Sequence, residues 1–213
     1  MIRLQGITKR LGDQLVLDGV TIDFAARSFT ALLGPSGSGK TTLLRVIAGL
    51  DQPDSGGLWL DGRPALRLRP GARKLGFVFQ GYGLFEHMTV AANIGFGLSV
   101  RGVSRRVIAE RVAAMLALVR LEGLGDRMPS QLSGGQRQRV ALARTLAVEP
   151  RILLLDEPFG ALDTVVREEL RTGLRTIHDR LGVTTVFVTH DRDEAVALAD
   201  RCIEMAGGRV AGE

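Results

Sequence analysis

The sequence predicts an α/β fold with a mainly parallel sheet covered by helices. Short apolar runs typical of buried strands recur along its 213 residues. Segments with apolar residues at helical spacing separate most of these runs, and glycine-rich turns lie between the two kinds of segment. Strands buried on both faces are apolar throughout, and parallel strands need such crossover segments, so this alternation favours a parallel sheet.

The first eighty residues are expected to contain five strands and one helix. Two strands flank a turn at Gly12 and Asp13, which predicts an antiparallel β subdomain at the N-terminus. A third, fully apolar strand runs directly into a glycine-rich loop and then a helix that ends at a glycine. The expected strands are Ile2–Thr8, Val16–Phe24, Phe29–Leu33, Leu58–Leu60 and Lys74–Gln80, and the helix is Thr41–Gly49.

Residues 81–139 differ in character and are interpreted as an inserted α-helical subdomain. No strand pattern interrupts them, and Ser104 is a suitable N-cap for a helix through Arg120. Residues 1–80 and 140–213 would then form the β subdomain and the core of a single domain covering 1–213. In the second part we expect strands at Ile152–Leu155, Val183–Thr189, Arg201–Met205 and Arg209–Val210, and a helix from Asp191 to Asp200 opened by a capping-box pattern of Asp191 and Glu194.

Composition excludes several classes of protein. Hydrophobic residues make up 45% of the chain, too many for a disordered protein, and the single cysteine excludes a disulfide scaffold. No secretory signal is recognisable, and the most membrane-like stretch, Leu75–Val100, contains five glycines and is interpreted as loop and short helices. We therefore expect a cytoplasmic protein. The net charge of +5 leaves nucleic acid and anionic lipid headgroups open as partners.

A phosphate-binding loop is the clearest motif. The segment Gly34-Pro35-Ser36-Gly37-Ser38-Gly39-Lys40-Thr41 fits G-x-x-x-x-G-K-[ST], with an apolar strand before it and a helix after it. Glycines let successive N–H groups turn toward phosphate oxygens, and the following helix adds the positive end of its dipole. We expect Lys40 to reach the β- and γ-phosphates and the Thr41 hydroxyl to bind Mg²⁺.

Polar residues at three other predicted strand ends complete a candidate catalytic set. Asp156 and Glu157 follow Ile152–Leu155, and ligands bind at the carboxyl ends of strands in open α/β sheets. We expect Asp156 to hold Mg²⁺ and Glu157 to act as general base toward water. His190 is expected to contact the γ-phosphate, and Gln80 to bind Mg²⁺ or water, whereas His87 and His178 are expected to be solvated.

One further segment points to a family. Leu132-Ser133-Gly134-Gly135-Gln136 precedes a helix expected to begin near Gln136, which offers a second anion-binding helix start. Taken with the phosphate loop, Gln80, the Asp156-Glu157 pair, Gly160–Asp163 and His190, it resembles the ATP-binding subunits of ABC transporters. The resemblance extends from Met1 to Val210. The run Leu132–Pro150 with Ile152–Asp163 most resembles bacterial importers of sulfate, molybdate, polyamines, ferric iron or maltose.

The resemblance implies a P-loop NTPase fold with a RecA-like core, and two ATP molecules with Mg²⁺ sandwiched in a head-to-tail homodimer. The signature segment, Leu132–Gln136, of one copy would contact the ATP held by the other. Asp163 would link the two ATP sites, and Gln80 would sense the γ-phosphate. The ATP-binding residues expected on this basis are Leu11, Gly34, Pro35, Ser36, Gly37, Ser38, Gly39, Lys40, Thr41, Thr42, Ser133, Gly134, Gly135, Gln136 and Asp163.

The resemblance also implies partners and a location. Transmembrane permease subunits would dock on the segment Gly83–Met88, and a solute-binding protein outside the membrane would act indirectly. The chain would be peripheral on the cytoplasmic face of the inner membrane. Three features depart from the family: Leu11 stands where an aromatic residue stacks on adenine, Glu86 stands where many relatives have proline, and the sequence stops where a C-terminal regulatory domain would start, so we expect none.

The substrate is expected to be a small inorganic anion such as sulfate or molybdate. An ABC-type ATPase acting on nucleic acid or ribosomes is the alternative, because the basic charge permits it. Those relatives usually carry paired cassettes, long insertions or basic tails, and in this sequence the arginines are spread along the chain. A P-loop kinase conflicts with the segment Leu132–Gln136. We therefore expect no nucleic acid partner.

Overall fold

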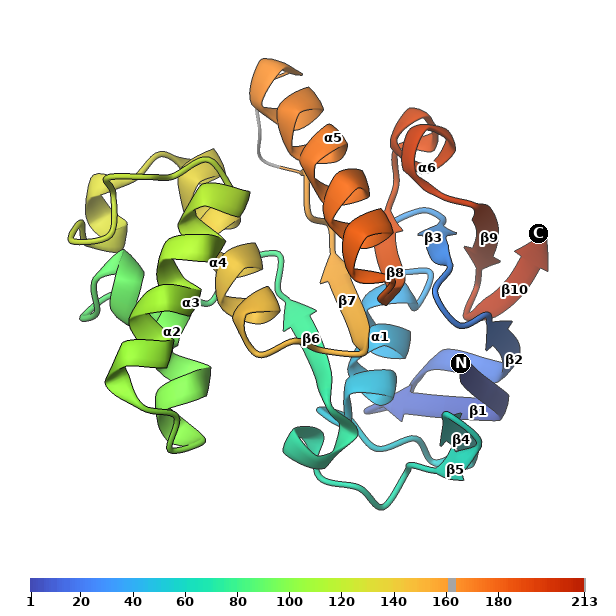
Figure 1. Cartoon of the computed structure of the whole chain (residues 1–213). Coiled ribbons are helices and arrows are strands. Elements are labelled where there is room, and N and C mark those ends of the chain that lie inside the picture. Colours follow the sequence, from blue (N-terminus) through green and yellow to red (C-terminus); the bar gives the residue numbers. More distant parts are fainter. Residues whose placement is uncertain (161–163, 213) are drawn as a thin grey trace. The chain divides into compact units, whose positions relative to one another are not determined.

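The computed structural model describes residues 1–160 and 164–212 (Figure 1). The expected site residue Asp163 lies outside this part of the chain. Two compact units are distinguished by their internal contacts. The first contains Met1–Phe77, Arg151–Glu157 and His178–Glu213, and the second contains Val78–Pro150 and Pro158–Ile177.

An antiparallel sheet of four strands, in the order β2-β1-β4-β5, belongs to the first unit. Its strands are β1 (Ile2–Leu11), β2 (Gln14–Phe24), β4 (Ser55–Leu60) and β5 (Arg63–Pro64). The register runs from Ile2 opposite Phe24 to Leu11 opposite Gln14, which closes the hairpin at Gly12 and Asp13. The N-terminal antiparallel β region expected from the sequence is confirmed.

A six-stranded sheet has the order β10-β9-β3-β8-β7-β6. Strand β3 pairs in parallel with β8 and β9, β7 pairs in parallel with β8, and β10 turns back antiparallel on β9. The mainly parallel sheet predicted from the apolar runs is therefore confirmed. The strands are β3 (Phe29–Leu33), β6 (Leu75–Val78), β7 (Ile152–Asp156), β8 (Thr184–Thr189), β9 (Arg201–Ala206) and β10 (Arg209–Gly212).

Helix α1 (Lys40–Ala48) anchors the core of the first unit. Its apolar face, with Leu43, Leu44 and Ile47 fully buried, packs in one cluster with residues of β1, β2 and β4 and with residues of β3, β7, β8 and β9. Burial of each such side chain stabilises the fold by about 1.5–3 kcal/mol. Because α1 follows the phosphate loop directly, this packing fixes the position of the loop as well. The other helix wholly within this unit is the short α6 (Arg192–Leu198).

The second unit is mainly helical, and its helices α2 (Val90–Val100), α3 (Arg105–Leu118) and α4 (Gly134–Ala147) pack against one another. Ser104 precedes α3 as expected, and a 3₁₀ turn at Pro129–Gln131 leads toward α4. Helix α5 (Thr164–Leu181) contributes its residues through Ile177 to this unit. Among residues 1–160 and 164–212, no helix combines the length and apolar character needed to cross a membrane.

Two local expectations were wrong. Helix α4 begins at Gly134, close to the expected Gln136, but α6 ends at Leu198 instead of Asp200. His178 is 3% exposed: Nδ1 lies 2.9 Å from the Thr185 hydroxyl, and the ring packs 4.8 Å from that of Phe29. The expectation of a solvated side chain failed because His178 lies on the buried side of α5, where its hydrogen bond offsets the loss of water.

Candidate active site

The phosphate loop connects β3 to α1 and depends on glycine at two positions. Gly34 has φ +150°, and a Cβ there would collide with the Met205 carbonyl oxygen on β9. Gly39 has φ +97°, and its Cβ would lie 2.6 Å from the Val16 carbonyl oxygen on β2. The loop therefore rests directly on the backbone of two strands, while Pro35, Ser36 and Gly37 are exposed at its crest.

Lys40 is 5% exposed and lies under this loop. Its Nζ donates to the carbonyl oxygens of Gly34 and Pro35, at 2.7 and 2.8 Å, and to the Ser38 hydroxyl at 3.3 Å. Burial lowers the pKa of Lys40, and the negative charges of Glu157 and Asp156 oppose that shift. Within the part of the chain that the structure describes, the Lys40 ammonium group is thus hydrogen-bonded to neutral oxygens. A phosphate would supply the negative charge that these hydrogen-bond partners lack, so Lys40 is suited to bind one.

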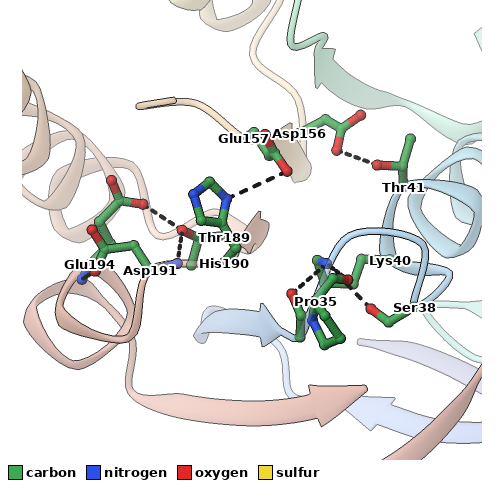
Figure 2. Close-up of polar contacts among 11 residues, drawn as sticks. Pro35, Ser38, Lys40, Thr41, Asp156, Glu157, Thr189, His190, Asp191 and Glu194 are labelled. Carbon is green, nitrogen blue, oxygen red and sulfur yellow. Dashed lines mark hydrogen bonds and ion pairs between the residues drawn. The ribbon is translucent and has the colours of Figure 1, made fainter. Parts of the chain in front are cut away.

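Thr41 and Asp156 form the candidate metal site. The Thr41 hydroxyl donates to Asp156 Oδ1 at 2.8 Å, and Asp156 is 6% exposed at the end of β7 (Figure 2). Burial raises the pKa of Asp156 and the charge of Glu157 adds to the rise, whereas the Thr41 hydrogen bond and Lys40 oppose it. A hydroxyl and a carboxylate oxygen are ligands that Mg²⁺ prefers, so these residues fit that ion.

Glu157 and His190 face each other across the ends of β7 and β8. Glu157 Oε1 lies 3.7 Å from His190 Nδ1, and the two side chains are 23% and 61% exposed. Figure 2 shows the imidazole directed at the carboxylate. Glu157 has a left-handed backbone, with φ +47°, and its N–H donates to the Val188 carbonyl at 3.2 Å. This turn directs the side chain of Glu157 away from that of Asp156, so the two carboxylates serve different partners.

The strand order explains why these groups meet. Strand β8 lies between β3 and β7, and the register pairs Leu33 with Thr189 and Asp156 with Val188. The three strands therefore end in the same row. The loops that follow them bring Lys40 and Thr41, Asp156 and Glu157, and His190 to one edge, as expected from the sequence.

Thr42 and Leu11 are the two other ATP-binding residues expected in the first unit. Thr42 follows Thr41 in the first turn of α1 and is half-buried. Leu11 is the last residue of β1, pairs with Gln14, and is 51% exposed. An exposed leucine at a hairpin end has room for a flat ring to lie against it.

The signature segment lies in the second unit and forms a capping box. The Ser133 hydroxyl accepts from Gln136 N at 3.3 Å, and Gln136 Oε1 accepts from Ser133 N at 2.9 Å. Ser133 and Gly134 are exposed, and Gly135 is buried. The Ser133 N–H donates to Gln136 within the capping box. The hydroxyl proton of Ser133 and the free N–H groups in the first turn of α4 therefore remain to bind an anion. Gln80 is exposed shortly after β6.

Sequence reasoning did not identify the residues that hold the segment Gly83–Met88. Asn93, fully buried on α2, accepts from Phe85 N at 2.9 Å and donates to the carbonyls of Phe85, Met88 and Thr89 at 3.0–3.1 Å. Arg144 on α4 donates to Gly83 O at 2.7 Å and lies 5.3 Å from the centre of the Phe85 ring. An asparagine among the apolar residues at the start of α2 was the available signal.

Comparison with known proteins gives consistent results. The family described as ABC transporter matches residues 17–160. The sulfate/thiosulfate import ATP-binding proteins CysA of Thermosynechococcus vestitus and Caulobacter vibrioides are 58% and 57% identical to the chain over 98% of its length. The chain spans about three fifths of those relatives, 62% and 63%. A probable CysA of Chlorella vulgaris is 51% identical, and the chain spans 89% of it.

Solved structures agree with the sequence relatives. Two dimeric structures of the ABC transporter cassette MJ0796, one of them bound to ADP and Pi, match with a TM-score of 0.90. Their identity to the chain is 34% and 35%, and the match covers 99% of this chain and 97% of theirs. The fold, the arrangement of the strand-end residues and these similarities lead to one conclusion: the chain belongs to the ABC transporter family.

Proposed function

We propose that this chain is the ATP-hydrolysing subunit of an ABC importer that carries sulfate or thiosulfate. The observation that carries the ATPase assignment is the row of strand ends that brings Lys40, the Thr41–Asp156 pair and the Glu157–His190 pair to one edge. Membership of the family supports ATP as the nucleotide. The transported substrate is proposed from the names of the most similar relatives.

In this proposal the phosphate loop binds the nucleotide through its backbone N–H groups and Lys40. Lys40 would exchange its bonds to Gly34 O and Pro35 O for bonds to the β- and γ-phosphate oxygens, whose negative charge would offset the loss of water on burial. Thr41 and Asp156, with Gln80, would hold Mg²⁺. When bound, this ion would neutralise charge on the phosphates.

The chemical step would use Glu157 and His190. Glu157 accepts a proton from the attacking water through a carboxylate oxygen, and the water oxygen bonds to the γ-phosphorus as the bond to the leaving ADP oxygen breaks. His190 donates to the γ-phosphate and faces the same carboxylate at 3.7 Å. The short distance between Glu157 and His190 supports the proposal that both act at the γ-phosphate.

A second copy would complete each site. The start of α4, with Ser133, Gly134, Gly135 and Gln136, would contact the ATP held on the partner. Asp163 is proposed to link the two ATP sites. The MJ0796 cassettes, which resemble the chain closely, are described as dimeric. Permease subunits would dock on Gly83–Met88, a solute-binding protein would deliver the anion, and the chain would be peripheral on the cytoplasmic face of the inner membrane.

The ATPase assignment is tested by measuring phosphate release from ATP with Mg²⁺. Lys40→Ala should reduce kcat/KM at least about a hundredfold, because the loss of this cation removes charge stabilisation worth several kcal/mol in a water-poor site. Lys74→Asn is the matched control, since Lys74 is exposed and asparagine tolerates its left-handed backbone of φ +52°. Equal activity of the two variants would remove Lys40 from the site.

The substrate assignment is tested separately by uptake of labelled anions. Cells lacking the gene for this chain should lose uptake of sulfate and thiosulfate, regain it with the wild-type chain, and not regain it with Lys40→Ala. Molybdate uptake should stay unchanged throughout. Loss of molybdate uptake alone would overturn the proposed substrate and leave the ATPase assignment standing.

A further inference from the structure

His190 is held in place by its neighbours in the chain. It stands between the end of β8 and the start of α6, and its own side chain is 61% exposed. The residue before it, Thr189, is 2% exposed. The Thr189 hydroxyl oxygen accepts from Asp191 N at 3.0 Å, so this hydrogen bond joins the two residues that flank His190 in the chain. The orientation of His190 therefore depends on the orientation of the Thr189 hydroxyl.

Glu194 fixes that hydroxyl. Its carboxylate is 5% exposed, and Glu194 Oε2 accepts the Thr189 hydroxyl proton at 2.5 Å (Figure 2). Asp191 Oδ1 in turn accepts from the N–H groups of Asp193 and Glu194, at 2.8 and 3.2 Å. The sequence pattern of Asp191 and Glu194 predicted a helix cap, and Asp191 does cap α6. The Glu194 carboxylate, however, reaches back to the strand.

We propose that Glu194 is a positioning residue for His190, acting through the Thr189 hydroxyl. This inference rests on the proposed function of His190 in ATP hydrolysis. A charged acceptor binds the hydroxyl proton strongly, so the oxygen lone pairs stay directed at Asp191 N. Since the site is buried, water does not replace the acceptor easily, and loss of the carboxylate frees the turn that carries the imidazole.

The test compares kcat and KM for ATP among variants of this network. Glu194→Ala and Thr189→Val should lower kcat roughly tenfold, the scale expected when a catalytic group is displaced by less than about 1 Å. KM for ATP should change less than about twofold, because the phosphate loop is untouched. Glu194→Gln keeps an acceptor oxygen and Thr189→Ser keeps the hydroxyl, so both should recover most of the lost rate.

A double-mutant cycle separates positioning from general damage to the fold. In a His190→Ala background, adding Glu194→Ala should reduce the remaining rate by less than about twofold, since the group it positions is already absent. Asp193→Asn is the matched control, because it removes an exposed carboxylate from the same turn of α6. An equal further loss with and without His190, or an unchanged kcat in Glu194→Ala, would overturn the proposal.

A measurement without nucleotide keeps the inference distinct from the proposed function. The chain has three histidines, so the ring signals of His190 are assignable by nuclear magnetic resonance. Glu157→Gln should shift the His190 ring signals in the wild-type background, and this shift should shrink in the Glu194→Ala background. A shift of undiminished size would show that Glu194 does not orient the ring, whatever the chain hydrolyses.

Discussion

At the scale of single residues, burial shifts the pKa values of two charged side chains of the nucleotide site in opposite directions. It lowers the pKa of Lys40 and raises that of Asp156, because each charged form loses water. The charged forms of both side chains are thus less stable in the free protein than they would be beside a ligand of opposite charge. Binding of a phosphate beside Lys40 and of Mg²⁺ beside Asp156 would therefore stabilise the charged form of each side chain.

The first prediction concerns Asp156. Its pKa in the folded state is raised, so its contribution to stability is greatest below its unfolded pKa of about 4 and is lost as pH rises through the folded value. Asp156→Asn lacks this titration, and without nucleotide its melting temperature should rise relative to wild type between about pH 4 and 7. The measurement is thermal unfolding across that pH range.

Asp51 is the matched control for this prediction. A hydrogen bond from Arg45, with Arg45 Nε 2.7 Å from Asp51 Oδ2, holds the pKa of Asp51 below its usual value. Its contribution is present above the unfolded pKa and is lost as pH falls, so Asp51→Asn should be destabilising at neutral pH. The same sign for both variants would contradict the electrostatic account.

A second prediction at this scale concerns Leu11. Leu11 is 51% exposed at the end of β1, so half of its surface is open to solvent. Leu11→Tyr should lower the KM for ATP by two- to tenfold, since stacking on an aromatic ring adds about 0.5–1.5 kcal/mol. A steady-state titration with ATP measures it. An unchanged or higher KM would show that this position does not face adenine.

At the scale of elements, Asn93 joins helix α2 to the segment before it. Four hydrogen bonds from one fully buried side chain satisfy the backbone at Phe85, Met88 and Thr89. The Phe85 and Thr89 carbonyls also accept from the backbone N–H groups of Met88 and Asn93, so the side chain adds a second bond to each and supplies the bonds to Phe85 N and Met88 O. The proposed docking segment is therefore held by a side chain that the sequence did not single out.

A third prediction follows for this element. Asn93→Ala should lower the free energy of unfolding by about 2–4 kcal/mol, because buried backbone groups lose their partner. Urea unfolding measures this loss. Ser99→Ala on the same helix is the control: Ser99 is exposed and bonds only to Phe96 O within its own turn, so the expected change is within about 0.5 kcal/mol. Similar values for both variants would contradict this role of Asn93.

The elements also show what the sequence could and could not predict. Apolar runs located the strands because burial on both faces leaves a local signature, and the polar residues that follow β3, β7 and β8 lie at one edge of the sheet, as expected. Side-chain hydrogen bonds between elements leave no such signature. The hydrogen bond between His178 and Thr185 and that between Glu194 and Thr189 depend on the packing around each group. The start of α4, by contrast, is fixed locally by the capping box of Ser133 and Gln136.

At the scale of the whole molecule, the fourth prediction concerns assembly. Glu157→Gln retains the hydrogen-bonding shape of Glu157 but accepts no proton from water, so ATP should stay bound and hold two copies together. Size-exclusion chromatography with ATP and Mg²⁺ should show a dimer, and with ADP a monomer. The double variant Glu157→Gln, Lys40→Ala should remain monomeric with ATP. A monomer of Glu157→Gln under all conditions would count against a shared site.

The row of strand ends has a kinetic consequence. Thr30 of β3 pairs with Val186 of β8, which in turn pairs with Leu154 of β7, so the nucleotide site exists only after three distant stretches of chain have joined. Pairings of such long sequence separation form late and slowly. Nucleotide added to a refolding chain should therefore leave the folding rate unchanged and slow the unfolding rate, because it recognises an arrangement that no earlier state contains.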